Sequence, residues 1–269
     1  MFVYKFFEPM FPIRDDNPQV FTPLVTYGLI CINVIVWVVV QGIGADPSLA
    51  ASICSLGLIP GELLQTLPAG TRFQVGPGAL CLLGDAAAWH TTVTSMFLHG
   101  GWLHLIGNMW FLWIFGGNVE DSMGPGRFVI FYLLCGLAAA FAQVVSNPTS
   151  AIPMVGASGA IGGVMGAYIL LYPRVRVHML VFFGFFVTTF AVPAVFVLGY
   201  WLLIQVFSGV GSLGAQGGGV AFWAHVGGFM AGAVLILFFR DKALLALHPY
   251  HGWQKQHGPT KNWHRVRRR

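Results

Sequence analysis

Six apolar stretches, each close to the length of a helix that crosses a bilayer, constrain this chain more than any other feature. Crossing about 30 Å of hydrocarbon takes roughly 20 residues of helix. Hydrophobic residues make up 56% of the chain and charged residues only 9%. That balance excludes a soluble protein, in which charged residues are normally about a quarter of the chain. We therefore predict an all-α polytopic membrane protein with spans at residues 23–41, 102–119, 128–145, 156–172, 192–207 and 220–239.

A further apolar segment, residues 179–190, is short for a span and is followed closely by Pro193. Lys and Arg residues collect on the cytoplasmic side of membrane proteins. Six spans place the basic C-terminal tail and most other Lys and Arg residues on that side, whereas seven spans would place the tail outside. We therefore predict an interfacial or re-entrant segment on the inner side. The protein is expected in the cell (inner) membrane with both termini in the cytoplasm.

This topology predicts a cytoplasmic N-terminal segment at 1–22, a six-span domain at 23–239 and a basic cytoplasmic tail at 240–269. The first residues lack a cleavable signal pattern, so the first span is expected to act as an uncleaved anchor. The net charge of +5 comes largely from the tail, for which the anionic inner leaflet is the expected partner rather than nucleic acid. The histidines of the tail lack compact metal-ligand spacing, and no metal or cofactor is expected.

The longest connection, residues 42–90, follows the first span and contains two apolar clusters. Such a connection is predicted to lie against the outer face of the bilayer or to dip into it, with its backbone groups satisfied by the protein. It also contains Cys54 and Cys81. An oxidising outer compartment would allow these two cysteines to pair, and the sequence leaves that question open.

A few polar residues interrupt the spans. His104 and Asn108 are four residues apart and therefore share one face of the second helix. Polar groups in spans generally face the interior of the bundle. Taken alone, this pair is also compatible with a purely structural hydrogen bond between helices. Ser158 in the fourth span is likewise compatible with a packing serine that bonds to a carbonyl one turn earlier.

Two stripes of small residues predict that the fourth and sixth spans pack closely, which would bring Ser158 to His225, the ionisable residue of the sixth span. At 1.5 Å per residue, both residues lie in the outer third of the membrane, together with His104 and Asn108. A hydroxyl, an imidazole, and a second imidazole beside an amide could serve as nucleophile, general base and oxyanion donors for acyl transfer. The stripes are Gly159 and Gly163 in the fourth span and Ala224, Gly228 and Gly232 in the sixth.

Three motifs carry a family resemblance that covers the chain from about Ile13 to Phe239. They are HGGWLHLIGN at residues 99–108, GASG at 156–159 and AHVGG at 224–228. In this order, on these helices, they resemble the signature of the rhomboid intramembrane serine proteases. The resemblance implies a six-helix rhomboid-like bundle with a large membrane-associated outer loop between the first two spans.

The resemblance also implies a Ser-His dyad without a cofactor. Ser158 would be the nucleophile and His225 the general base, while His104, Asn108 and the Ser158 backbone N–H would stabilise the oxyanion. The implied substrates are single-span or polytopic membrane proteins, cleaved in segments that unwind near the outer face. Oligomeric state is not implied.

The sequence departs from the family at two positions. Many members carry a tyrosine that stacks on the catalytic histidine, whereas this chain has Gly162, so what orients His225 is open. Many also carry Trp-Arg before the second span, where this chain has Trp89 and His90. The second departure puts the anchoring of the outer loop in doubt, but it leaves the predicted chemistry unchanged.

Two alternative functions come from other classes. One is a catalytically silent rhomboid-like binder of transmembrane clients, which the intact Ser158 and His225 argue against. The other is a small-solute transporter, which predicts polar groups at the membrane midplane and a pseudo-repeat, neither of which the sequence contains. Among the remaining polar residues, Glu120 and Asp121 are predicted to form a solvated cluster near Arg127, and Gln205 to make a structural hydrogen bond.

Overall fold

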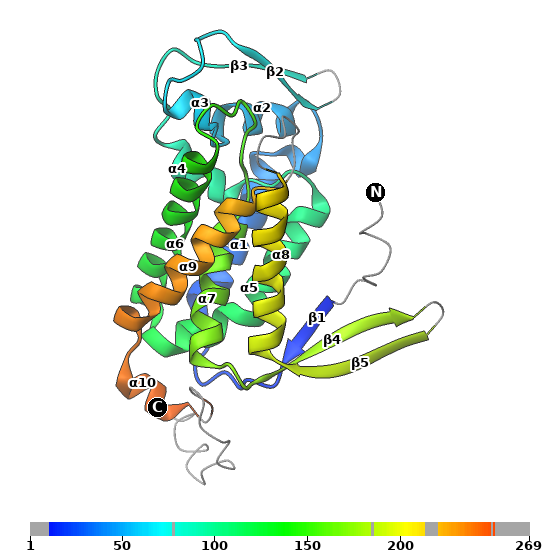
Figure 1. Cartoon of the computed structure of the whole chain (residues 1–269), viewed down its shortest axis with the longest axis vertical. Helices are drawn as coiled ribbons and strands as arrows, with labels where there is room; N and C mark the ends of the chain where they lie inside the picture. Colours follow the sequence, from blue (N-terminus) through cyan, green and yellow to red (C-terminus); the bar gives the residue numbers. More distant parts are fainter. Residues whose placement is uncertain (1–10, 77–78, 184–185, 213–219, 249, 251–269) are drawn as a thin grey trace.

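The computed structural model describes residues 11–76, 79–183, 186–212, 220–248 and 250. Within these residues, six helices run between the two ends of an elongated bundle (Figure 1). Each coincides with one of the six predicted spans to within a few residues. We call the end with the connection between the first two of these helices the cap end, and the opposite end the sheet end. The six helices are α1 (Leu24–Val39), α5 (Trp102–Met123), α6 (Pro125–Ser146), α7 (Ser158–Leu171), α8 (Ala194–Gly211) and α9 (Phe222–Phe239).

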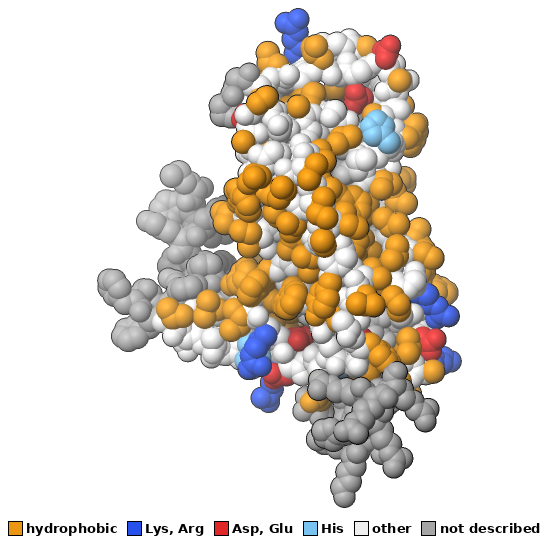
Figure 2. Space-filling view, turned by 180° about the vertical axis from the view of Figure 1, so that it is seen from behind, with side chains coloured by type: hydrophobic (Ala, Val, Ile, Leu, Met, Phe, Trp, Pro, Cys, Tyr) orange, Lys and Arg blue, Asp and Glu red, His pale blue; other side chains and the backbone are white. Residues whose placement is uncertain are grey.

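The face of the bundle seen in Figure 2 carries a belt of apolar side chains, with charged side chains gathered at the two ends. Leu103, Phe141, Phe207 and Phe238, from four different helices, are each at least 70% exposed. Soluble proteins do not expose contiguous apolar surface on this scale. By length and composition, three of the described helices, α6, α8 and α9, are able to cross a membrane. The chain is therefore a multi-pass membrane protein.

Helix α7 lies at the centre of the bundle, and residues 159–168 along it are all buried. Its glycines let α9 approach until the two backbones touch. A Cβ atom placed on Gly228 would lie 1.9 Å from the carbonyl oxygen of Gly159, and one on Gly232 would lie 1.9 Å from that of Gly163. The predicted contact between the two small-residue stripes is confirmed, and we call this contact the α7–α9 seam.

Five described strands correct the all-α prediction. In the three-stranded antiparallel sheet at the sheet end, β4 lies between the other two strands. Buried Val177, Met179 and Val181 alternate with more exposed Arg176 and His178, and this period of two is typical of a strand. The predicted interfacial segment is therefore most of a β-hairpin beside the bundle. The strands are β1 (Phe11–Asp15), β4 (Arg176–Phe183) and β5 (Phe186–Pro193) in this sheet, and β2 (Arg72–Gly76) and β3 (Ala79–Leu82) in the cap.

The carboxylates of Glu120 and Asp121 lie at the sheet end, and both residues are at most 5% exposed. Asp121 accepts hydrogen bonds from the backbone N–H groups of residues 20 and 21. Glu120 accepts from the backbone of residues 25 and 26 and from the Thr26 hydroxyl, and so satisfies donors in the first turn of α1. The prediction of a solvated cluster was wrong because both side chains hold the N-terminal segment on the bundle. Arg127 pairs instead with Asp241, at 3.7 Å.

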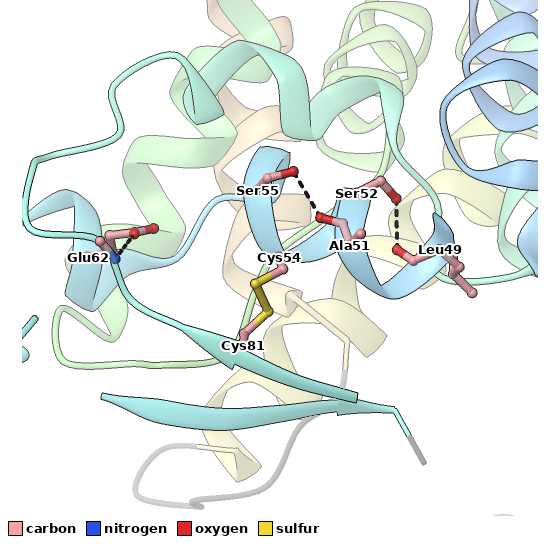
Figure 3. The surroundings of a disulfide bond; sticks show 8 residues. Leu49, Ala51, Ser52, Cys54, Ser55, Glu62 and Cys81 are labelled. Carbon is pink, nitrogen blue, oxygen red and sulfur yellow. Dashed lines mark hydrogen bonds between the residues drawn. A yellow bond between two sulfur atoms is a disulfide. The ribbon is translucent and has the colours of Figure 1, made fainter. Parts of the chain in front are cut away.

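Residues 42–90 form most of a folded cap over the bundle. A disulfide between Cys54 and Cys81, with a Cα–Cα distance of 5.6 Å, joins α2 to β3 (Figure 3). The pairing that the sequence left open is thus present in the structure. Besides β2 and β3, the elements between α1 and α5 are η2 (Gly42–Gly44), α2 (Ser48–Leu56), α3 (Pro60–Leu63), α4 (Thr91–Thr94) and η3 (Ser95–Phe97). A last short helix, α10 (Lys242–Leu247), lies at the sheet end.

Candidate active site

A cavity of about 880 Å³ opens in the bundle near the cap end. It is lined by residues of five helices, α5 to α9, and of the segments that precede α5, α7 and α9. The four residues that the sequence singled out all line it: His104, Asn108, Ser158 and His225. Residues from three separate helices therefore meet in one space.

The turn before α7 sets the position of Ser158. Gly156 has φ +128°, a conformation that residues with a side chain rarely adopt. Its N–H donates to the carbonyl oxygen of Ser95 at 2.9 Å, which ties the turn to the cap. The helix begins at Ser158, so the hydroxyl lies at a helix N-terminus. The first N–H groups of a helix have no partner within it and carry its positive dipole end.

The hydroxyl of Ser158 contacts the imidazole of His225. The distance from Ser158 Oγ to His225 Nε2 is 2.7 Å. Ser158 is the first residue of α7, and His225 lies in the first turn of α9. The α7–α9 seam continues directly below both residues, so their separation is set by backbone packing rather than by long side chains.

Helix α8 supplies two contacts to the ring of His225. The Oε1 atom of Gln205 lies 2.7 Å from His225 Nδ1. The Trp201 ring packs at a tilt against the imidazole, with ring centroids 5.6 Å apart and an interplanar angle of 38°. A Cβ atom on Gly162 would lie 3.8 Å from the Trp201 ring, so the indole occupies space beside that glycine. These contacts answer the question that Gly162 raised in the sequence, because α8 holds the imidazole.

Two hydrogen-bond donors face a small space beside Gly156. His104 Nδ1 accepts from the Gly100 N–H at 3.2 Å, so the neutral ring carries its proton on Nε2. A Cβ atom on Gly156 would lie 2.7 Å from that Nε2 and 3.5 Å from Asn108 Nδ2. Asn108 Nδ2 is buried and has no hydrogen-bond partner. Such a donor costs free energy in a folded protein and calls for an explanation.

His99 supports this arrangement from outside the helix. Its backbone N–H and carbonyl bond to the two ends of the Gln41 amide, each at 2.8 Å. Its ring packs edge-on against His104, with centroids 5.2 Å apart. Burial, together with the nearby His104, lowers the pKa of His99 to about 3, so the ring is neutral. His99 therefore anchors the end of the cap and buttresses His104.

Together these residues form a hydroxyl–imidazole pair beside a group of hydrogen-bond donors, an arrangement suited to acyl transfer. In the part of the chain that the structure describes, no group of three or more His, Cys, Asp or Glu side chains is placed to hold a metal ion. The sequence identified four of the side chains by type and depth. It missed Trp201, and it did not link Gln205 to His225, because both contacts depend on how α8 packs against α9.

The comparisons with known proteins all point to the same family. The model of the rhomboid domain family matches residues 86–242, more than half of the chain. Rhomboid-like protein 11, chloroplastic, from Arabidopsis thaliana is 38% identical over 100 residues, which cover 37% of this chain and 35% of that protein. Rhomboid protease GluP from Bacillus subtilis is 34% identical over 147 residues, covering 55% of this chain and 26% of that protein.

A more distant similarity links the chain to a mitochondrial protein. Rhomboid protein 1, mitochondrial, from Saccharomyces cerevisiae is 28% identical over 158 residues, covering 56% of this chain and 42% of that protein. The chain thus spans less than half the length of each of these three relatives. The residues that the family model matches include α5 to α9, the helices that line the cavity.

Proposed function

The chain belongs to the rhomboid family, and from that premise we propose that it is an intramembrane serine endopeptidase acting through a Ser-His dyad. One observation carries the proposal: Ser158 Oγ lies 2.7 Å from His225 Nε2. The pair lines a cavity near the cap end of the bundle. A packing serine would bond to a carbonyl in its own helix. Serine and imidazole in direct contact are instead the elements of an activated nucleophile.

In the proposed reaction, Ser158 Oγ attacks the scissile carbonyl carbon while its proton passes to His225 Nε2. The tetrahedral intermediate collapses, the peptide C–N bond breaks, and His225 gives the proton to the leaving amine. An acyl-enzyme ester remains on Ser158. Water then attacks this ester, with His225 again accepting a proton, and the carboxylic acid product leaves as Oγ regains its hydrogen.

The negative charge that develops on the carbonyl oxygen needs donors that are already in position. We assign this role to His104 Nε2–H, the Asn108 amide and the Ser158 backbone N–H. The unpaired Asn108 Nδ2 supports the assignment, because a donor without a partner in the resting protein is free to bond an oxyanion. Each such donor contributes on the order of 100- to 1000-fold in rate.

For the membrane topology, we propose six spans, the helices α1 and α5 to α9, with the sheet end in the cytoplasm and the cavity opening to the outer side of the cell membrane. The distribution of basic residues supports this orientation. The structure describes seven Lys and Arg residues, and one of them, Arg72, is at the cap end. The other six lie at the sheet end: Arg14, Arg127, Arg174, Arg176, Arg240 and Lys242. Residues 1–22 and 240–269 are then the cytoplasmic segments that flank the six-span domain, and the cap lies at the outer membrane face.

The proposed substrates are single-span or polytopic membrane proteins. A transmembrane helix hides its carbonyl groups in its own hydrogen bonds. Only a segment that unwinds can present a carbonyl carbon to Ser158. We therefore expect cleavage near the outer boundary of substrate helices that carry Gly, Ala or Pro, with small residues at the cut.

The test is cleavage of a single-span reporter with an Ala-rich, helix-weak outer boundary, reconstituted in liposomes with wild type, Ser158→Ala or His225→Ala protein. The wild type is expected to release a cut product, and each variant to lose about 10⁴-fold or more of the rate. Ser122→Ala is the matched control. Its hydroxyl bonds to the carbonyl of Val119 at 2.6 Å, which is the packing role that Ser158 would have in a silent protein.

Two results would contradict the proposal. One is cleavage that survives in both dyad variants. The other is no cleavage by the wild type across several reporters while the reporter co-purifies equally with wild type and both variants, which would instead support a silent binder of transmembrane clients.

A further inference from the structure

The imidazole of a serine–histidine pair has to meet two conditions. Its Nε2 atom must be free of a proton so that it can accept one from the serine hydroxyl, and its ring plane must point at that hydroxyl. A neutral imidazole carries its proton on one nitrogen only, and the partner of the other nitrogen decides which. What contacts Nδ1 of His225 is therefore a question about reactivity as well as packing.

In serine hydrolases with a triad, a carboxylate accepts a hydrogen bond from the Nδ1–H of the histidine. Here the residue at that position is Gln205, whose Oε1 lies 2.7 Å from His225 Nδ1. Gln205 is only 7% exposed. An amide oxygen can accept a hydrogen bond but cannot donate one. With that oxygen at Nδ1, the proton sits on Nδ1 and leaves Nε2 as the acceptor for Ser158.

A second contact from the same helix fixes the plane of the ring. Trp201 lies four residues before Gln205, so both side chains project from one face of α8. The indole packs at a tilt against the imidazole and stacks in turn on Phe229, with centroids 6.1 Å apart. The imidazole is thus in contact with the amide at Nδ1 and with the indole beside it. Rotation of His225 away from Ser158 would break both contacts.

We propose that Gln205 is the positioning residue of the dyad and that it selects the Nδ1-protonated tautomer of His225 in place of a carboxylate. This inference rests on the proposed function, since it assigns a third residue to the same site. Gln205 does not touch the substrate and acts through His225. It supplies orientation without adding a negative charge to the interior of the membrane, where an ionised carboxylate is costly.

The test compares Gln205→Met, which keeps the length of the side chain but loses the acceptor, with Gln205→Glu, which keeps an acceptor oxygen. Gln205→Met is expected to lower kcat by about 10- to 100-fold, with KM changed by less than about twofold. Gln205→Glu should recover activity to within about threefold of the wild type. Ile204→Met, a change to the neighbouring and 40% exposed residue of α8, is the matched control and should behave as wild type.

A spectroscopic measurement tests the tautomer without any substrate. The ¹⁵N spectrum of histidine-labelled protein distinguishes a protonated from an unprotonated ring nitrogen, and the His225→Ala spectrum identifies the signals of His225. The wild type and Gln205→Glu should show a protonated Nδ1, whereas Gln205→Met should show a mixture of tautomers. The rate at which a fluorophosphonate labels Ser158 should fall in Gln205→Met in parallel with kcat.

Two results would overturn the inference. In one, Gln205→Met keeps both the wild-type kcat and the wild-type ¹⁵N pattern. In the other, Gln205→Met and Gln205→Glu lose activity equally and also melt earlier than the Ile204→Met control, which would make the amide merely structural. A wild type that neither cleaves nor labels would count against the proposed function alone, because the ¹⁵N spectrum still reports which nitrogen of His225 is protonated.

Discussion

The two ends of the bundle both bury polar side chains, but they use them in opposite ways. At the sheet end, Glu120 and Asp121 accept five hydrogen bonds, all from the N-terminal segment or the first turn of α1. At the cap end, the four candidate-site residues include no carboxylate, they line a cavity, and the amide nitrogen of Asn108 has no partner. The formal charge of a buried side chain therefore does not distinguish the candidate site from the rest of the molecule. What distinguishes it is a hydrogen-bond donor left without a partner beside a cavity.

This difference separates fold from chemistry. A side chain whose hydrogen bonds are complete in the resting protein contributes to stability, and removing it leaves other buried groups unpaired. A donor kept unpaired contributes nothing to the resting fold and becomes useful only when a ligand atom arrives. Substitutions at the sheet end should therefore lower stability, and substitutions at the cap end should lower the rate.

The largest effect is expected for Glu120→Ala at the sheet end. The change leaves three donors at the start of α1 without an acceptor, and should destabilise the protein by about 3 to 5 kcal/mol. Chemical denaturation in detergent micelles measures this loss. Glu120→Gln, which keeps an acceptor, should lose less. Cleavage per folded molecule should stay at the wild-type value, and an unchanged free energy of unfolding would break the comparison at this end.

The next effect is expected for Asn108→Leu at the cap end. Loss of one proposed oxyanion donor should lower kcat by about 100- to 1000-fold, or roughly 3 to 4 kcal/mol in the barrier. Stability should change little or rise, because the substitution removes a buried donor that has no partner. Steady-state cleavage and denaturation of the same preparation give both numbers. A variant with normal kcat and reduced stability would show that Asn108 is structural.

A substitution in the α7–α9 seam, between the two ends, should affect both stability and rate, because the seam holds two helices of the bundle together and sets the distance from Ser158 to His225. Gly232→Ala would place a methyl group 1.9 Å from the Gly163 carbonyl oxygen. The helices must move apart, which should cost about 1 to 3 kcal/mol of stability and reduce cleavage as Ser158 separates from His225. Gly199→Ala on α8 is the control, because a Cβ there meets nothing within 4 Å. Equal behaviour of the two variants would mean that the seam tolerates a methyl group.

The smallest effect concerns pH at the sheet end. Burial raises the pKa of Asp15 from 3.8 to about 6, with the Tyr168 hydroxyl and the backbone as its hydrogen-bond partners. The folded state therefore favours the protonated acid, so this stabilising contribution is complete below about pH 4 and is lost as the pH rises through 6. Asp15→Asn should reduce the change in the free energy of unfolding between pH 5 and 7.5 by about 1 to 2 kcal/mol.

Thermal unfolding at several pH values measures the effect of Asp15. Asp85→Asn, the same substitution at an exposed residue of the cap end, is the control. Two results would contradict the assignment. In one, the unfolding temperature of the wild type does not fall between pH 5 and 7.5; in the other, the unfolding temperature of Asp15→Asn falls by as much as that of the wild type.

Most of the helices could be predicted because a long apolar stretch indicates a helix in a membrane protein. The prediction was wrong where charged residues were assumed to be exposed. It ended the second span at Val119, although α5 continues through buried Glu120 and Asp121 to Met123. It also missed the strand β4, because an apolar run was read by its length rather than by the alternation of Val177, Met179 and Val181 with more exposed residues. Local composition does not show which carboxylate will find backbone donors more than ninety residues away in the sequence.

The candidate site was predictable in part, for a related reason. Ser158, His225, His104 and Asn108 stand out as polar residues in apolar helices, and small-residue stripes indicate which helices meet. Gln205 was visible by the same signal, but its partner was not. Trp201 carries no signal at all, since a tryptophan in a span is common. Contacts to one edge or face of a ring depend on the rotation of α8 against α9, which the sequence pattern does not specify.

The order of the helices along the chain has a consequence for how the protein is made. The ribosome completes α7, with Ser158, before it reaches α9, the last of the six helices. Until α9 has entered the membrane and packed along the seam, the proposed nucleophile has no proton acceptor. Under the proposed mechanism, a half-made chain would be inert towards its neighbours in the crowded membrane, and activity would begin only when the last helix completes the bundle.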